Sequence, residues 1–153
     1  MEYTCEIKKQ NPTPTICVRT TTSVENLPMV LGQSWGALGA YMEQNGAQPA
    51  GVPYVAYFNM DMQNLSVEIG FPLAEPLEGA GALLAATMPD ADVAVTMHAG
   101  PYTELGAAYE ALTEYVQSKN RLPTGIAYEF YYNSPMEVKP EQLLTQIMFV
   151  LQD

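Results

Sequence analysis

The residues best suited to chemistry lie in one apolar stretch, residues 125–133, where Glu129 is the single charged group. Aromatic and aliphatic side chains fill most of this stretch, which predicts a buried β-strand ending at the turn signal Asn133-Ser134-Pro135. Side chains alternate along a strand, so Glu129 and Tyr131 are expected on one face. A buried carboxylate is costly unless it is paired or hydrogen-bonded. The stretch therefore predicts a site built around Glu129.

The same stretch occurs once before, 74 positions upstream, as residues 51–59. The aromatic frame recurs: Tyr54, Tyr57 and Asn59 match Tyr128, Tyr131 and Asn133. Val55 stands where the later copy has Glu129, so the repeated frame does not need the carboxylate. The match extends into the segments on either side and predicts two copies, residues about 3–73 and 80–151.

Each copy is predicted to contain a hairpin, a helix and a second hairpin. Helices are expected at residues 28–45 and 102–119, where apolar residues recur at helical spacing. Strands are expected at residues 3–9, 15–20, 52–58, 65–71, 82–87, 93–97, 126–132 and 143–151. The predicted fold class is α+β. It is a pseudo-twofold tandem repeat in which each half is a small antiparallel sheet with one helix on one face, with a ligand cleft between the halves. Residues 1–153 are expected to form a single domain.

The amino-acid composition and the net charge exclude several classes of function. The chain has 153 residues and a net charge of −11, from 17 acidic and 6 basic residues, which argues against direct nucleic-acid binding and suits attraction of cations. No apolar run is long enough to span a membrane and no signal pattern opens the chain, so we expect a cytoplasmic protein without a membrane partner. One histidine and two scattered cysteines predict no metal site. Without a Ser-His-Asp set or a cofactor fingerprint, we assign no cofactor and no catalytic residue.

The predicted ligand-binding residues are Glu129, Tyr131, Tyr57, Trp35, Glu68, Tyr102 and Met148. Tyr57 and Tyr131 are expected to wall the cleft, because a tyrosine hydroxyl packed between sheets would need its own partner. Tyr54 and Tyr128, on the alternate parity, are expected to face the helices as core residues.

Two of these residues, Trp35 and Glu68, keep two interpretations. Trp35 lies on the apolar stripe of the first helix and belongs either to the core or to a cleft edge. Glu68 alternates with apolar neighbours, which points it away from the helix, either to solvent or into the cleft as a second acid. Met148, opposite in parity to Phe149, is predicted as a soft, adaptable cleft residue.

Several motifs carry a family resemblance. They are the segment His98-Ala99-Gly100-Pro101-Tyr102, the Glu129-bearing strand, the segment Pro140-Glu141-Gln142-Leu143 and the Met88-Pro89 turn. In this order and within a doubled layout, the chain resembles the GyrI-like family, the effector-binding domain also found fused to multidrug-responsive transcription activators. The resemblance implies an aromatic-walled cleft at the pseudo-twofold junction, where Glu129 faces bulky cationic or amphipathic ligands. It also makes Tyr102 a candidate pocket residue.

Three functions follow as hypotheses. The first is a stand-alone small-molecule-binding protein that senses or sequesters hydrophobic, cationic ligands, or presents them to a protein partner. We expect the two repeats to use all of residues 1–153, with no segment among them for the DNA-binding helix-turn-helix of the fused relatives. The first alternative is a hydrolase of strained electrophilic molecules, which some stand-alone family members resemble, using Glu129 and a tyrosine. The second alternative is a protein-interaction or inhibitor module. The missing catalytic sets make the enzyme less favoured than the binder.

Overall fold

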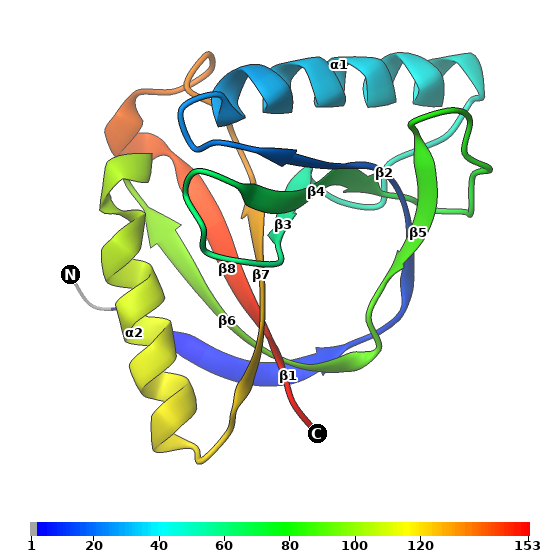
Figure 1. Ribbon diagram of the computed structural model, residues 1–153. Helices are drawn as coiled ribbons and strands as arrows, with labels where there is room; N and C mark the ends of the chain where they lie inside the picture. The colour runs from blue at the N-terminus through cyan, green and yellow to red at the C-terminus, as the bar shows by residue number, and fades with distance from the viewer. Residues whose placement is uncertain (1–2) are drawn as a thin grey trace. The chain divides into compact units, whose positions relative to one another are not determined.

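The computed structural model describes residues 3–153, which form two compact units. Residues 3–10 and Asp90–Asp153 form the first, here called the discontinuous unit. Asn11–Pro89 form the second, here called the inserted unit because it lies between the two pieces of the first along the chain. Each unit is an antiparallel sheet with one long helix (Figure 1).

The discontinuous unit has four strands in the order β1-β6-β8-β7. Its elements are β1 (Cys5–Gln10), β6 (Ala91–Ala99), η1 (Tyr102–Glu104), α2 (Leu105–Ser118), β7 (Pro123–Tyr131), η2 (Pro140–Gln142) and β8 (Leu144–Leu151). α2 packs on β6 and β1. Ala108, Leu112 and Val116, at helical spacing, bury one stripe of α2. They meet a core that includes Ile147 and Phe149 of β8.

The inserted unit repeats this plan with the strand order β3-β4-β2-β5. Its elements are β2 (Thr13–Thr22), α1 (Leu27–Gln44), β3 (Tyr54–Tyr57), β4 (Leu65–Pro72) and β5 (Leu84–Met88). α1 starts with a proline in its first turn, packs on β4 and β2, and buries Leu38 and Met42 against Ile16 and Leu73. Within residues 3–153, neither helix combines the length and the apolar character that crossing a bilayer requires.

Strand pairing departs from the predicted pair of early hairpins. β1 pairs with β6, and β5 pairs with β2, so the first strand of each sequence copy joins the sheet of the other copy. The later hairpins form as predicted, with β3 on β4 and β7 on β8. The two sheets have equivalent strand orders when β1 corresponds to β5, and the remaining elements correspond in turn. The exchange keeps every pairing antiparallel.

The helix-facing side of β3 and β7 is the reverse of the predicted one. In β7, Ala127 packs in the core beneath α2, and Glu129 lies opposite Ile147 of that core. Glu129 and Tyr131 therefore point to the α2 side, and Tyr128 points away. The same register argument in the inserted unit puts Tyr57 on the α1 side and Tyr54 on the other. Alternation was predicted correctly, and Glu68 and Met148 lie away from the helices as predicted, but the helix side of β3 and β7 was not.

Candidate functional site

Glu129 lies in β7 of the discontinuous unit and accepts hydrogen bonds from two tyrosines. Its side chain is buried, with the residue 8 % exposed. The Tyr131 hydroxyl donates to Oε1 at 2.6 Å, and the Tyr109 hydroxyl donates to Oε2. Tyr131 is two residues further along the same strand, and Tyr109 comes from the facing surface of α2. The carboxylate is thus fixed on both oxygens by neutral donors.

Aromatic rings surround this carboxylate. Tyr102, in η1 just before α2, meets the Tyr131 ring edge-on, with 6.0 Å between ring centroids. Tyr109 also packs against Phe149, with 5.7 Å between centroids. Burial, and then the charge of Glu129, raise the pKa of the Tyr102 phenol. Tyr102 is 38 % exposed, so the ring that meets Tyr131 reaches the surface.

No ion pair to Glu129 is present among residues 3–153. The other buried carboxylate, Glu68 of β4, is 4 % exposed and is neutralised. Arg19 Nε donates to its Oε1 at 2.9 Å, and the Tyr54 hydroxyl donates to its Oε2 at 2.7 Å. The chain therefore holds two buried carboxylates of different character. Glu68 has its own cation, whereas the hydrogen bonds that Glu129 accepts in the described part of the chain come from the hydroxyls of Tyr109 and Tyr131.

The seven predicted ligand residues do not form a single cluster. Glu129, Tyr131 and Tyr102 come together in the discontinuous unit. Met148 of β8 is in the same unit but pairs with Tyr128, so it lies buried on the opposite face of the sheet from Glu129. The interpretation of Glu68 as a solvated group is wrong, because Glu68 is buried and paired with Arg19.

The remaining predicted residues, Trp35 and Tyr57, belong to the inserted unit. Trp35 packs against the core beneath α1, and its indole N–H donates to the Gly70 carbonyl at 3.4 Å. Tyr57 is half-buried at the end of β3, on the side that α1 covers. Their role in ligand binding stays a prediction, as does the cleft between the halves.

Sequence reasoning missed Tyr109 and Arg19, which the structure brings to these carboxylates, and it placed Tyr54, the hydroxyl donor to Glu68, on the helix side. Tyr109 lies at helical spacing with the apolar residues of the second predicted helix, and a phenol at such a position needs a hydrogen-bond partner for its hydroxyl. That requirement was the available signal. Arg19 gave no signal of its own, because its contact with Glu68 depends on the β2–β4 register, in which the two residues are opposite each other.

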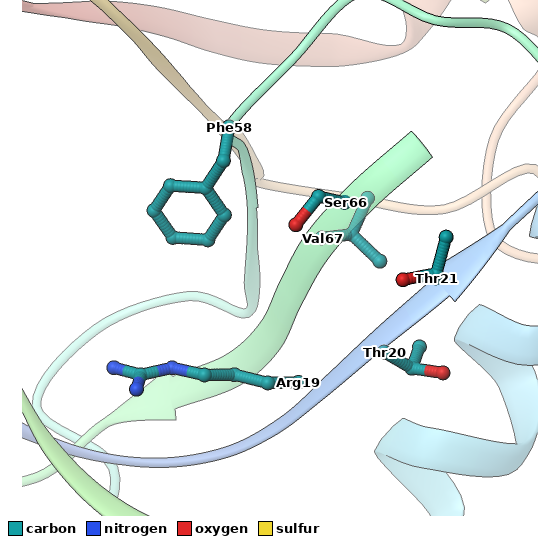
Figure 2. Close-up of a pocket in the computed structure, with 6 residues that line it drawn as sticks. All are labelled: Arg19, Thr20, Thr21, Phe58, Ser66 and Val67. Carbon is teal, nitrogen blue, oxygen red and sulfur yellow. The ribbon is translucent and has the colours of Figure 1, made fainter. Parts of the chain in front are cut away.

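A separate hollow of about 490 Å³ opens on the inserted unit (Figure 2). It is lined by Arg19, Thr20, Thr21, Phe58, Ser66 and Val67. None of the seven predicted ligand residues lines it.

Comparison with solved structures identifies the same fold in three proteins of low sequence identity. The C-terminal domain of EcmrR matches with a TM-score of 0.83 at 19% identity, covering 100% of this chain and 99% of that one. In the EcmrR–DNA complex the match has a TM-score of 0.84 at 18% identity and covers 99% of this chain but only 58% of the longer EcmrR chain. A hydrolase from Listeria innocua has a TM-score of 0.71 at 11% identity, with 97% and 91% covered. SAV2435 bound to tetraphenylphosphonium has a TM-score of 0.70 at 11% identity, with 99% and 94% covered.

A comparison with curated protein sequences finds no match. The family comparison is decisive, because the GyrI-like small molecule binding domain matches residues 3–152, nearly the whole chain. With the doubled sheet-and-helix plan and the structural likenesses above, the chain belongs to the GyrI-like small molecule binding domain family.

Proposed function

We propose that this GyrI-like domain binds lipophilic cations and that Glu129 supplies the counter-charge. The observation that carries the proposal is that the buried carboxylate of Glu129 is held by two tyrosine hydroxyls and has no ion-pair partner among residues 3–153. A buried charge without a counter-charge is costly, so a bound cation gains the Coulomb attraction that Glu68 obtains from Arg19. Sensing or sequestering such cations is the role that this chemistry serves.

The rings beside Glu129 support the choice of a bulky aromatic cation over a metal ion. A cation lying against the faces of Tyr102 or Tyr131 gains about 2 kcal/mol for each desolvated ring contact. Two such contacts and the burial of apolar surface suffice for micromolar affinity, about −8 kcal/mol. The net charge of −11 favours the approach of any cation. SAV2435, which shares the fold, was solved with tetraphenylphosphonium, and we take that ion as the probe.

The test is a calorimetric titration with tetraphenylphosphonium, using tetraphenylborate as a probe of matched shape and opposite charge. We expect the wild type to bind the phosphonium with micromolar affinity and to reject the borate. Glu129→Gln keeps the shape of the side chain but removes its charge, so affinity should fall at least tenfold, or about 1.4 kcal/mol. Glu110→Gln, an exposed acid on α2, is the matched control and should bind as the wild type does.

Equal binding by wild type and Glu129→Gln would refute the proposed role of this carboxylate. The same samples test the hydrolase alternative when strained electrophilic compounds replace the phosphonium and the products are examined by mass spectrometry. A product formed by the wild type and lost in Glu129→Gln would favour the hydrolase. A domain that binds neither class would favour the protein-interaction module.

A further inference from the structure

Arg19 is held in place by a chain of buried groups in the inserted unit. The Tyr54 hydroxyl donates to Glu68 Oε2 at 2.7 Å, and Glu68 Oε1 accepts from Arg19 Nε at 2.9 Å. Tyr54 is fully buried and Glu68 nearly so, which leaves the carboxylate little freedom to move. The hydrogen bond and the charge of Glu68 raise the pKa of the Arg19 guanidinium, so it stays charged. The head of an otherwise flexible side chain is therefore preorganised.

The outer edge of that guanidinium is available. Only Nε is used in the contact with Glu68, and across residues 3–153 the two terminal nitrogens of Arg19 have no hydrogen-bond or ion-pair partner. The Arg19 side chain is 57% exposed. A guanidinium presents its N–H groups in a planar fork, and the edge formed by two nitrogens matches the two oxygens of a carboxylate. The charge that Glu68 orients is thus presented to solvent in a form suited to bidentate recognition.

This edge borders the hollow of about 490 Å³, a volume within the range of small-molecule sites. Ser66 of β4 pairs with Thr21 of β2, so the two hydroxyl side chains lie side by side on the sheet face that also carries Arg19. Phe58 follows β3 and its backbone N–H donates to the Ser66 carbonyl, which places its exposed ring next to them. Figure 2 shows the Phe58 ring and the Arg19 guanidinium bordering the same open space, with the Ser66 hydroxyl pointing toward it.

We propose that this hollow is a second binding site and that it takes small aromatic monocarboxylates. The carboxylate pairs with the terminal nitrogens of Arg19, the ring lies against Phe58, and the Ser66 hydroxyl donates to a carboxylate oxygen. The net charge of −11 and the adjacent Glu68 disfavour ligands with more than one negative charge. This site lies wholly within the inserted unit, and its ligand is opposite in charge to the one proposed for Glu129.

The simpler interpretation of Arg19 is that it only neutralises Glu68. A lysine would supply the same charge to Glu68 but could not offer a planar two-nitrogen edge to a second carboxylate. The substitution Arg19→Lys therefore separates the two interpretations. The chain contains one other arginine, Arg121, which pairs with Asp92 at 3.0 Å in the discontinuous unit. Arg121→Lys is the matched control.

The experiment is a titration of the full chain with 2-naphthoate, followed by amide chemical shifts. We expect saturable shifts centred on Arg19, Phe58 and Ser66, about tenfold weaker binding in Arg19→Lys, and unchanged binding in Arg121→Lys. Phe58→Leu alters an exposed side chain, so it should fold normally and weaken 2-naphthoate binding as an independent variant. Shifts elsewhere only, or wild-type affinity in both Arg19→Lys and Phe58→Leu, would overturn the proposal.

Two further probes separate the contributions of charge and ring. Acetate carries the carboxylate without the ring, and 2-naphthalenemethanol carries the ring without the charge, so each should bind more weakly than 2-naphthoate. Acetate binding as tightly as 2-naphthoate would overturn the role of Phe58, and equal binding of the alcohol would overturn that of Arg19. Glu129→Gln should leave 2-naphthoate binding unchanged, which keeps this result independent of the phosphonium titration.

Discussion

Glu129 and Glu68 show how the surroundings of a residue decide what a buried carboxylate can do. Both accept a tyrosine hydroxyl, but only Glu68 has an arginine as well. The charge of Glu68 is used within the protein, because its carboxylate orients the guanidinium of Arg19. Glu129 keeps its charge uncompensated by any cationic side chain in the described part of the chain, and that charge is the basis of its proposed attraction for cations.

The tyrosine donors should also matter for stability. Tyr131→Phe or Tyr109→Phe removes one hydrogen bond from a buried charged group and should lower the free energy of unfolding by about 1–3 kcal/mol, measured by urea denaturation. Tyr132→Phe is the control, because the exposed Tyr132 hydroxyl donates only to Gln146, at 3.3 Å, and its loss should cost less than about 0.5 kcal/mol. If all three variants lost the same stability, the contacts with Glu129 would not be special.

Contacts to the two buried carboxylates could be predicted from the sequence where both residues lie on the same strand. The spacing of Glu129 and Tyr131 along one strand was enough to place them on one face, and the Tyr131 hydroxyl contacts the carboxylate. Tyr109 and Arg19 reach their carboxylates from other elements. Those contacts depend on how α2 packs on its sheet and on how β2 is registered against β4. A repeat and an alternation pattern do not contain that information.

At the scale of elements, Gly70 in β4 shows how closely the chain packs around Glu68. A Cβ at this position would lie 2.7 Å from the Ile16 carbonyl oxygen, 2.8 Å from the Tyr54 hydroxyl and 2.9 Å from Cys17 Cβ. The first of these neighbours is backbone and the second is the hydroxyl that donates to Glu68. The sheet can therefore relieve the contact only by moving a strand or by disturbing the Tyr54–Glu68–Arg19 chain.

Gly70→Ala should accordingly destabilise the protein by about 1–3 kcal/mol, read as a lower midpoint in thermal or urea unfolding. Gly36→Ala is the matched control, since Gly36 lies exposed in α1 with open space where a Cβ would be. Alanine is the better helix former, so that variant should be more stable than wild type by about 0.5–1 kcal/mol. A stable Gly70→Ala protein would mean that the strands yield more easily than their packing indicates.

The positions of the elements were predicted well, because every predicted helix and strand has a counterpart in the structure. Periodicity and turn residues were sufficient for that. For β3 and β7, the side that faces the helix was not predictable in the same way. Both faces of β7 carry aromatic residues, with Tyr128 and Phe130 stacked on one and Tyr131 on the other. Apolar content therefore could not identify the face that α2 covers.

At the scale of the whole molecule, the exchange of first strands sets which parts of the chain can fold alone. A hairpin between neighbouring strands was the natural expectation for residues 3–20, since close strands pair most often. Instead β1 pairs with β6, with Cys5 opposite Thr96. Cys5 and Ile7 pack against the core beneath α2. The inserted unit is continuous along the chain, whereas the discontinuous unit needs both of its pieces.

The two units should therefore differ in their ability to fold as separate fragments. Residues 11–89 should give a dispersed amide spectrum and a cooperative thermal transition on their own. Residues 90–153 should do so only when a peptide of residues 1–10 restores the missing edge strand and covers the core. A peptide carrying Ile7→Asp is the control and should not restore folding, because it places a charge against that core. Cooperative folding of residues 90–153 without any peptide would contradict this division.

The separation of β1 from its partner β6 along the chain also has a consequence during synthesis. A ribosome makes β1 before the whole of the inserted unit and makes its partner β6 only afterwards. The inserted unit can therefore complete its sheet while β1 is still an unpaired strand with free backbone groups, the kind of edge on which nascent chains associate wrongly. Lys8 and Lys9 lie in β1. Lysine side chains on an exposed strand edge discourage its pairing with other chains, and they should protect β1 in this way until β6 has been synthesised.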